Sequence, residues 1–149
     1  MIIISHRGNL EGIDRETENT EQQIQKAICL GFHVEVDVWL INDKVFLGHD
    51  GPENESSLSF LKNEMIWCHA KNIEAFNYLL ENNVHTFWHQ TDDVVLTSLG
   101  YLWTFPGKKL TKNSICVLPE NSSYSDNEVR SCAGMCTDYP KRYKHDLQL

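Results

Sequence analysis

Residues 33–40 read His-Val-Glu-Val-Asp-Val-Trp-Leu, a run in which valines alternate with charged and aromatic side chains. Alternate residues of a β-strand point to opposite faces, so the valines would share one face and Glu35 and Asp37 the other. A face of β-branched residues suits packing against helices. The run therefore predicts a strand with one apolar face and one face that carries two carboxylates.

Seven further short apolar runs lie along the chain, separated by polar segments: residues 2–5, 45–48, 65–68, 84–88, 100–105, 114–118 and 134–137. A helical period of apolar residues predicts an amphipathic helix at 73–81. A second helix is expected at 21–30, where Asn19 or Thr20 would cap the start. Short helices are expected at 92–98 and 125–131. Strands that alternate with helices indicate an α/β protein.

Chain length limits what these strands can build. The chain has 149 residues, whereas an ordinary (β/α)₈ barrel needs roughly 200 or more. Only residues 41–44 separate the second run from the third, too few for a crossover helix. We therefore expect a compact (β/α)₈ TIM-type barrel with several helices shortened or missing, formed by one domain over residues 1–149. An open α/β sheet fits the same pattern.

Composition excludes several classes of protein. Hydrophobic residues make up 41% of the chain, enough for a core, and the net charge of -8 leaves no basic stripe for nucleic acid. The apolar run Met1–Ile4 stops at Ser5, which is too short for a signal peptide or a transmembrane segment. The five cysteines form no CxxC pair, as expected of reduced thiols in a cytoplasmic protein. The oligomeric state stays open.

Polar residues gather where the predicted strands finish: Ser5-His6-Arg7-Gly8, His49-Asp50, His69-Ala70-Lys71, His89-Gln90, Pro119-Glu120 and Thr137-Asp138. In α/β barrels the loops after the strands form the active site. We therefore expect these residues to meet at one end of the sheet.

Glu35 and Asp37 are the most informative pair. Two buried carboxylates on one face repel each other and lose hydration, so they need a cation. Hard oxygen ligands favour Mg²⁺ or Ca²⁺. A solvent-facing polar edge of an amphipathic strand would show the same spacing.

The remaining residues add acid–base and phosphate-binding groups. His6 and His49 offer acid–base groups that suit proton transfer. Arg7 and Lys71 suit the binding of phosphate oxygens. Together with the carboxylates they fit a metal-assisted attack on a phosphodiester, a small-molecule substrate.

Aromatic residues near the ends of the fifth and sixth runs are candidates for the substrate-lining wall. His89 and Trp103 are the residues we assign to it, beside Trp88 and Phe105. Their faces could attract a choline headgroup, although packing in the core would also explain them.

Four ordered motifs carry a resemblance to a known family: His6-Arg7-Gly8, Glu18-Asn19-Thr20, Glu35-Val36-Asp37-Val38 and His49-Asp50. In order and spacing they resemble the glycerophosphodiester phosphodiesterase family, within the phosphoinositide-phospholipase-C-like phosphodiesterases. Ala70-Lys71 and the segment 136–140 resemble later parts of the family pattern, and beyond Asp50 the match is patchy.

The resemblance implies a (β/α)₈-type barrel enzyme that hydrolyses a glycerophosphodiester to glycerol 3-phosphate and an alcohol. It implies that His6 and His49 are the acid–base pair and that Glu35 and Asp37 hold a divalent cation. It further implies that the phosphate is bound by Arg7 and Lys71, and that Glu18 is a supporting or ligating carboxylate.

Two departures from the family pattern qualify these expectations. His69 stands where the family usually has a third carboxylate ligand, which would favour Mn²⁺ or Zn²⁺. Residues 50–63 are shorter than the family's segment over the site. A related phosphodiesterase that acts on a lysophospholipid or another lipid headgroup, and a catalytically inactive binding domain, therefore remain alternatives.

Overall fold

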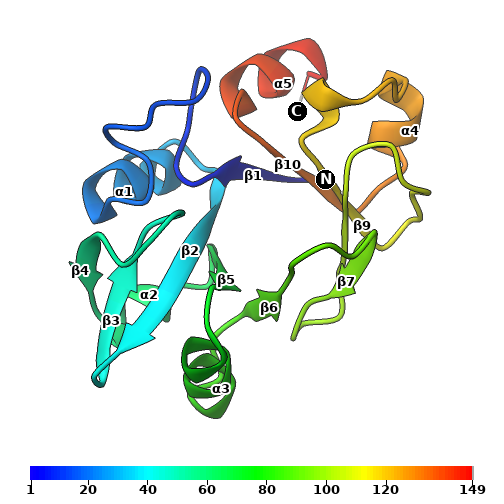
Figure 1. Cartoon of the computed structure of the whole chain (residues 1–149). Coiled ribbons are helices and arrows are strands. Elements are labelled where there is room, and N and C mark those ends of the chain that lie inside the picture. The colour runs from blue at the N-terminus through cyan, green and yellow to red at the C-terminus, as the bar shows by residue number, and fades with distance from the viewer. Residues whose placement is uncertain (149) are drawn as a thin grey trace.

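The computed structural model describes residues 1–148 and is shown in Figure 1. Within these residues there are five α-helices: α1 (Glu21–Cys29), α2 (Leu58–Leu61), α3 (Ile73–Glu81), α4 (Asp126–Arg130) and α5 (Pro140–Asp146). A 3₁₀ helix covers Pro119–Asn121. The strands are β1 (Ile2–His6), β2 (His33–Ile41), β3 (Lys44–Leu47), β4 (Asn54–Ser56), β5 (Ile66–Ala70), β6 (Thr86–Trp88), β7 (Val94–Leu96), β8 (Leu102–Thr104), β9 (Ser114–Val117) and β10 (Gly134–Thr137).

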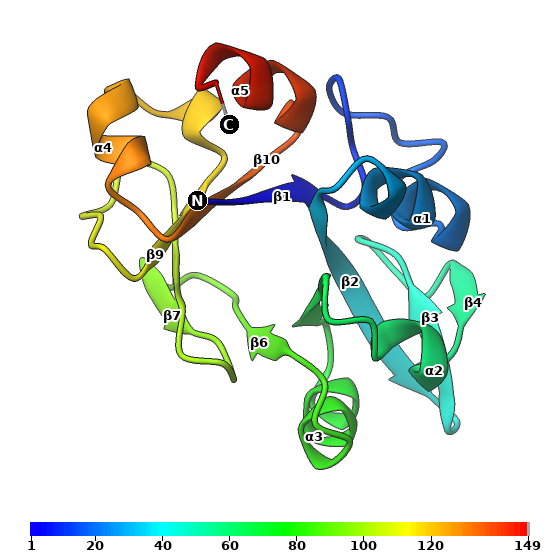
Figure 2. The same ribbon diagram turned by 180° about the vertical axis from the view of Figure 1, so that it is seen from behind.

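All the strands belong to one mixed sheet that curls strongly, as Figures 1 and 2 show from opposite sides. Its parallel part runs β6-β5-β2-β1-β10-β9-β8. Strands β3 and β4 extend antiparallel from the second half of β2, and β7 pairs antiparallel with β8. Parallel strands bring their carboxyl ends to one edge, which places β1, β2 and β5 side by side there.

The expectation of a (β/α)₈ TIM-type barrel is wrong, because the curled sheet is open. In residues 1–148 no ladder joins β6 to β7 or β8. Two hydrogen bonds join β6 to the turn after β7: the Ser98 amide donates to the Thr86 carbonyl (2.8 Å), and the Thr86 amide donates to Ser98 Oγ (2.9 Å). Residues 92–98, predicted as a short helix, contain β7 instead. Because this segment forms an antiparallel strand, residues 1–148 contain no further parallel strand that could close the sheet.

The elements follow from local sequence. In β2 the even-numbered valines, Val34, Val36 and Val38, are buried in the core between the sheet and helices α1 and α3. Helix α3 lies where its period predicts, and the Asn72 side chain caps it by accepting the Ala75 amide. Thr20 caps α1 in the same way, through the Gln23 amide.

A second core lies inside the curl. It contains Ile4, Trp67, Phe87, Trp103, Ile115, Val117 and Cys136. These side chains fill the interior, so the free space of the curl is restricted to one end.

Two further sequence expectations concern membrane-spanning segments and the state of the cysteines. None of the helices in residues 1–148 has the length and apolar character that crossing a membrane requires. The cysteines are free thiols; Cys29 is exposed and the other four are buried.

Candidate active site

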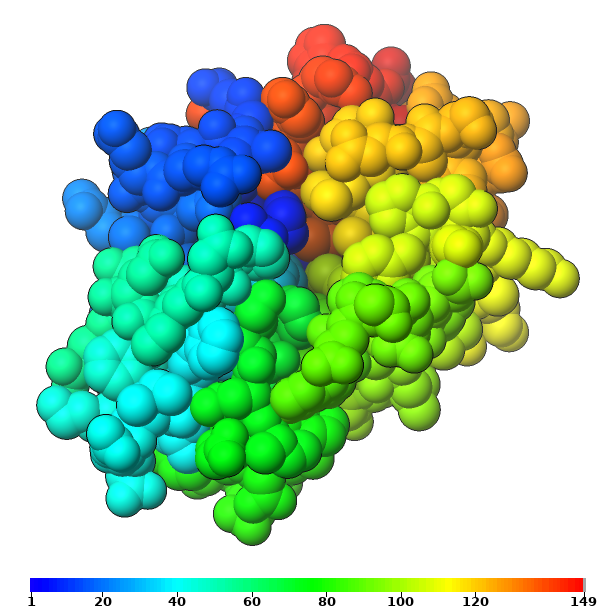
Figure 3. Space-filling model, in the orientation of Figure 1, coloured from blue at the N-terminus to red at the C-terminus, as the bar shows by residue number. Residues whose placement is uncertain are grey.

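A cavity of about 480 Å³ opens at the carboxyl ends of β1, β2 and β5. Its charged and histidine residues are His6, Arg7, Glu35, Asp37, His49, His69, Lys71 and His89. Figure 3 shows a recess near the centre of this face of the molecule, bordered by dark-blue, green and yellow segments. The strand-end residues that the sequence singled out are therefore brought together, although they are spread over more than half of the chain.

Glu35, Asp37 and His69 form a buried group that could hold a metal ion. The two carboxylates are only 2% and 1% exposed, and the ligand atoms of the three residues all lie within 4.8 Å of one another. Parallel pairing explains the meeting, because the β2–β5 register sets Asp37 directly beside His69. The solvent-facing alternative for the two carboxylates is excluded.

The two carboxylates differ in charge preference. Burial and the neighbouring Asp37 raise the pKa of Glu35. Burial also opposes ionisation of Asp37, yet the hydrogen bond from His49 and the nearby His69 and Lys71 hold its pKa well below the usual range. Asp37 is contacted by side chains from four parts of the chain: Arg7, Asn19, His49, His69 and Lys71.

Two carboxylate oxygens of this group lack a hydrogen-bond partner. Buried Glu35 Oε2 and Asp37 Oδ1 accept no hydrogen bond. His69 Nε2 lies 3.3 Å from the His89 carbonyl, which can only accept, so Nε2 carries a hydrogen. Nδ1 of His69 then faces Asp37 Oδ1 at 3.0 Å and Glu35 Oε1 at 3.7 Å. When His69 is neutral with its hydrogen on Nε2, the Nδ1 lone pair and these carboxylate oxygens converge, and this donor set fits a cation.

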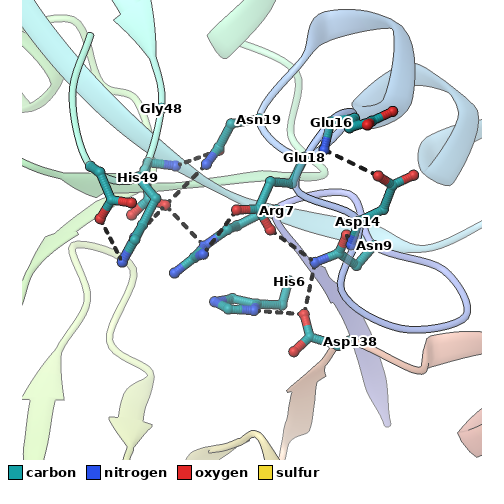
Figure 4. Close-up of polar contacts among 12 residues, drawn as sticks. His6, Arg7, Asn9, Asp14, Glu16, Glu18, Asn19, Gly48, His49 and Asp138 are labelled. Atoms are coloured by element: carbon teal, nitrogen blue, oxygen red, sulfur yellow. Dashed lines mark hydrogen bonds and ion pairs between the residues drawn. The ribbon is translucent and has the colours of Figure 1, made fainter. Parts of the chain in front are cut away.

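His6 stands at the end of β1 and is held by Asp138, as Figure 4 shows. Its Nδ1 lies 2.8 Å from Asp138 Oδ1, and its Nε2 lies 3.8 Å from Glu35 Oε2. Burial disfavours the charged ring, but Asp138 and Glu35 outweigh burial and raise the pKa of His6. Burial likewise opposes the Asp138 charge, and the hydrogen bond with His6 lowers the pKa of Asp138. The pair is therefore a histidine oriented by a carboxylate.

His49 lies on the loop after β3 (Figure 4). Its Nδ1 is 3.2 Å from Asp37 Oδ2, and its side chain is half-exposed. The loop is fixed by the Trp39 indole N–H, which donates to the Gly48 carbonyl at 2.7 Å. Gly48 has φ +151°, and a Cβ there would lie 2.2 Å from the Gly51 carbonyl oxygen. Only glycine fits this turn, which aims His49 into the cavity.

The predicted phosphate-binding cations both reach the cavity. Arg7 Nε lies 3.1 Å from Asp37 Oδ2, and Arg7 Nη1 donates to Glu18 Oε1 at 3.2 Å. Lys71 Nζ lies 3.4 Å from Asp37 Oδ1. Glu18 also accepts from Asn9 Nδ2 at 3.4 Å. The Glu18 carboxylate thus supports Arg7 and stands outside the Glu35, Asp37 and His69 group.

Sequence reasoning gave no role in the site to several residues that shape it; Asn19 was named only as a candidate helix cap. Asn19 holds Asp37 from two sides: its Nδ2 donates to Asp37 Oδ2 (3.1 Å), and its Oδ1 accepts the Asp37 amide (3.0 Å). Asn9 Nδ2 and the Glu120 carboxylate hold Asp138, the latter through the Asp138 amide at 2.9 Å. The position of Asp138 after the last predicted strand was the available signal for its role.

The predicted substrate-lining residues His89 and Trp103 both line the cavity. His89 stacks on Phe105 with ring centroids 3.7 Å apart, and Trp103 packs against Phe87 at 4.5 Å. Trp103 is only 3% exposed, so much of its ring belongs to the inner core. Trp88 also packs edge-on against Phe76 of α3.

Comparison of the chain with protein-family models, curated proteins and solved structures found no significant match.

Proposed function

We propose that this protein is a metal-dependent phosphodiesterase that hydrolyses a glycerophosphodiester to glycerol 3-phosphate and an alcohol. The observation that supports the proposal is one cavity in which two histidines, each paired with a carboxylate, flank Glu35, Asp37 and His69. Arg7 and Lys71 stand beside the same group. The sequence resemblance to the glycerophosphodiester phosphodiesterases points the same way.

The cations of the site bind the anionic substrate. Arg7 and Lys71 neutralise the non-bridging phosphate oxygens, on which negative charge builds up as the nucleophile attacks. Because the whole chain carries a net charge of -8, attraction of the phosphodiester has to be local. Glu18 keeps the Arg7 guanidinium in place for this contact.

The histidines move the protons. One removes a proton from the attacking hydroxyl, which is water or the 2-hydroxyl of the glycerol. Attack by the 2-hydroxyl gives a cyclic phosphate, which water then opens to glycerol 3-phosphate. The other donates a proton to the oxygen of the leaving alcohol, so the P–O bond breaks without release of an alkoxide. Asp138 holds the ring of His6, and Asp37 that of His49, in the orientation for transfer.

Glu35, Asp37 and His69 are the residues that would hold the divalent ion. When bound, the ion supplies positive charge that polarises the phosphate. The sequence favours Mg²⁺ or Ca²⁺ through its carboxylates. Nδ1 of His69 replaces a hard oxygen by a nitrogen ligand, so we propose a borderline ion, Mn²⁺ or Zn²⁺, ahead of Mg²⁺ and Ca²⁺.

The function is tested by phosphorus NMR of glycerol 3-phosphate release from glycerophosphodiesters. We expect chelation to abolish release and a divalent metal to restore it. His6→Ala and His49→Ala should each lower the rate by about 10²–10⁴-fold. His145→Ala is the matched control, because its side chain is 90% exposed. Full activity after metal removal, or unchanged turnover in either site variant, would contradict the proposal.

The choice of ion is tested by His69→Glu. This change restores a third carboxylate and should shift the preferred ion from Mn²⁺ or Zn²⁺ toward Mg²⁺ or Ca²⁺. Titration calorimetry of each metal into both proteins measures the shift without an activity assay. An unchanged order of metal affinities would show that His69 is not a ligand.

A further inference from the structure

We propose that the apolar half of the cavity is a subsite for a hydrocarbon substituent of the phosphodiester. The substrate class is then a glycerophosphodiester whose second substituent is an uncharged alkyl or acyl-bearing group, not a polyol or a choline. As a statement about turnover it rests on the proposed function; as a statement about binding it does not.

The cavity has two chemically different walls. The charged wall comes from β1, β2, β5 and the His49 loop. The apolar wall is formed by Trp103, Phe105, Val117 and Leu118, on β8, β9 and the turns after them, while His89 and Gln90 add polar groups to the same cavity. Phe105 and Leu118 are half-buried and pack on the inner core. A ligand that bridges both walls needs an anionic end and an apolar end.

Leu118 is held in an unusual backbone conformation. It follows β9 with φ +43° and ψ +58°, the left-handed region, which costs a non-glycine residue about 1–2 kcal/mol. Its amide donates to the Cys136 carbonyl at 2.7 Å. The strained turn places an apolar side chain on the cavity wall, where a smaller residue would suit the backbone better. Strain of this kind gathers at ligand sites.

The same wall offers little to a choline headgroup. A quaternary ammonium needs open aromatic faces or a carboxylate. His89 covers one face of Phe105, and Trp103 is 3% exposed. The carboxylates that line the cavity, Glu35 and Asp37, both stand on the charged wall. Hydrocarbon is the chemistry that this wall matches.

Matched pairs of phosphate esters test the binding directly. Propyl phosphate and glycerol 3-phosphate share a three-carbon skeleton with and without hydroxyls. 3,3-Dimethylbutyl phosphate and phosphocholine share a shape without and with the charge. Calorimetry with Mn²⁺ present should show that the hydrocarbon member of each pair, propyl phosphate or 3,3-dimethylbutyl phosphate, binds at least about tenfold tighter than its partner. From methyl to butyl phosphate, affinity should rise by up to about fourfold per methylene. Equal affinities, or tighter binding of phosphocholine, would overturn the proposal.

Two variants localise the effect. Leu118→Gly removes the side chain where glycine suits the backbone, and should reduce the preference for propyl phosphate by about three- to tenfold. Leu99→Gly removes a leucine that is 66% exposed outside the cavity and should leave the preference unchanged. Thermal melting checks that both fold. A folded Leu118→Gly protein with the full preference would overturn the assignment of the wall.

Turnover separates this proposal from the proposed function. If the protein cleaves diesters, the glyceryl propyl diester should react faster than glycerophosphoglycerol. Tight propyl phosphate binding without any turnover would reject the phosphodiesterase and keep the subsite. Turnover without the propyl preference would reject the subsite and keep the phosphodiesterase.

Discussion

Strand β2 spans nine residues and is hydrogen-bonded to β1, β5 and β3, whereas β6 spans three residues and pairs only with β5 among the described strands. Strand β2 carries Glu35 and Asp37, whereas β6 leads to His89. Buried charges need partners at fixed positions, because a misplaced partner leaves an uncompensated charge. Apolar contacts tolerate shorter strands and an incomplete sheet, since they have no direction.

Catalytic activity should therefore fall steeply when one partner of a buried charged group is changed. Asp138→Asn keeps the size of the side chain, but its amide can donate to His6 and favour the wrong tautomer. We expect kcat to fall by about 10²–10⁴-fold with little change in KM or melting temperature. Steady-state kinetics on a glycerophosphodiester measure the effect. A variant within twofold of the parent kcat would show that Asp138 does not orient His6.

A smaller loss of activity is expected when a site residue is displaced but not removed. In Gly48→Ala the new Cβ meets the Gly51 carbonyl, so the loop that carries His49 has to shift. A displacement of about 1 Å costs on the order of 10²-fold in rate. Gly51→Ala is the matched control in the same loop, because a Cβ there meets no atom within 4 Å. Equal activity of the two variants would mean that the position of His49 does not limit the rate.

The two sides also differ in how far the sequence predicts them. The alternation in residues 33–40 predicted β2 and the shared face of Glu35 and Asp37. The helical period predicted α3 at its observed bounds. These are local properties, because each depends on side chains that one element presents to a core.

Closure of the sheet is not a local property. Asp92 and Asp93 are typical helix-capping residues, yet Val94–Leu96 form β7, because this segment pairs antiparallel with β8. The partner of His6 was hidden for a similar reason. The register Ser5↔Thr137 brings Asp138 to His6, and no spacing in the sequence encodes a register between the two ends of the chain.

The smallest of the expected effects is a dependence of stability on pH, and it arises where the sheet is open between β6 and β7. His85 lies beside the opening, with Nε2 2.9 Å from Thr97 Oγ1 and its ring 4.1 Å from that of Trp67. Burial, with a contribution from nearby His33, lowers the pKa of His85 to about 4. Below pH 6.5 the unfolded chain takes up a proton that the folded chain refuses. This contribution to stability is therefore complete above pH 6.5 and is lost as the pH falls toward 4.

Between pH 7.5 and pH 5 the loss attributable to His85 should be about 2 kcal/mol. His85→Gln keeps a hydrogen-bonding group for Thr97 and removes the titration. Between pH 7.5 and pH 5, the unfolding free energy of this variant should therefore fall by about 2 kcal/mol less than that of the parent. Urea unfolding followed by tryptophan fluorescence at both pH values measures the difference. His145→Gln, an exposed histidine, should keep the parent's pH dependence. If His85→Gln shows the same pH dependence as the parent, His85 does not contribute to the acid sensitivity of the fold.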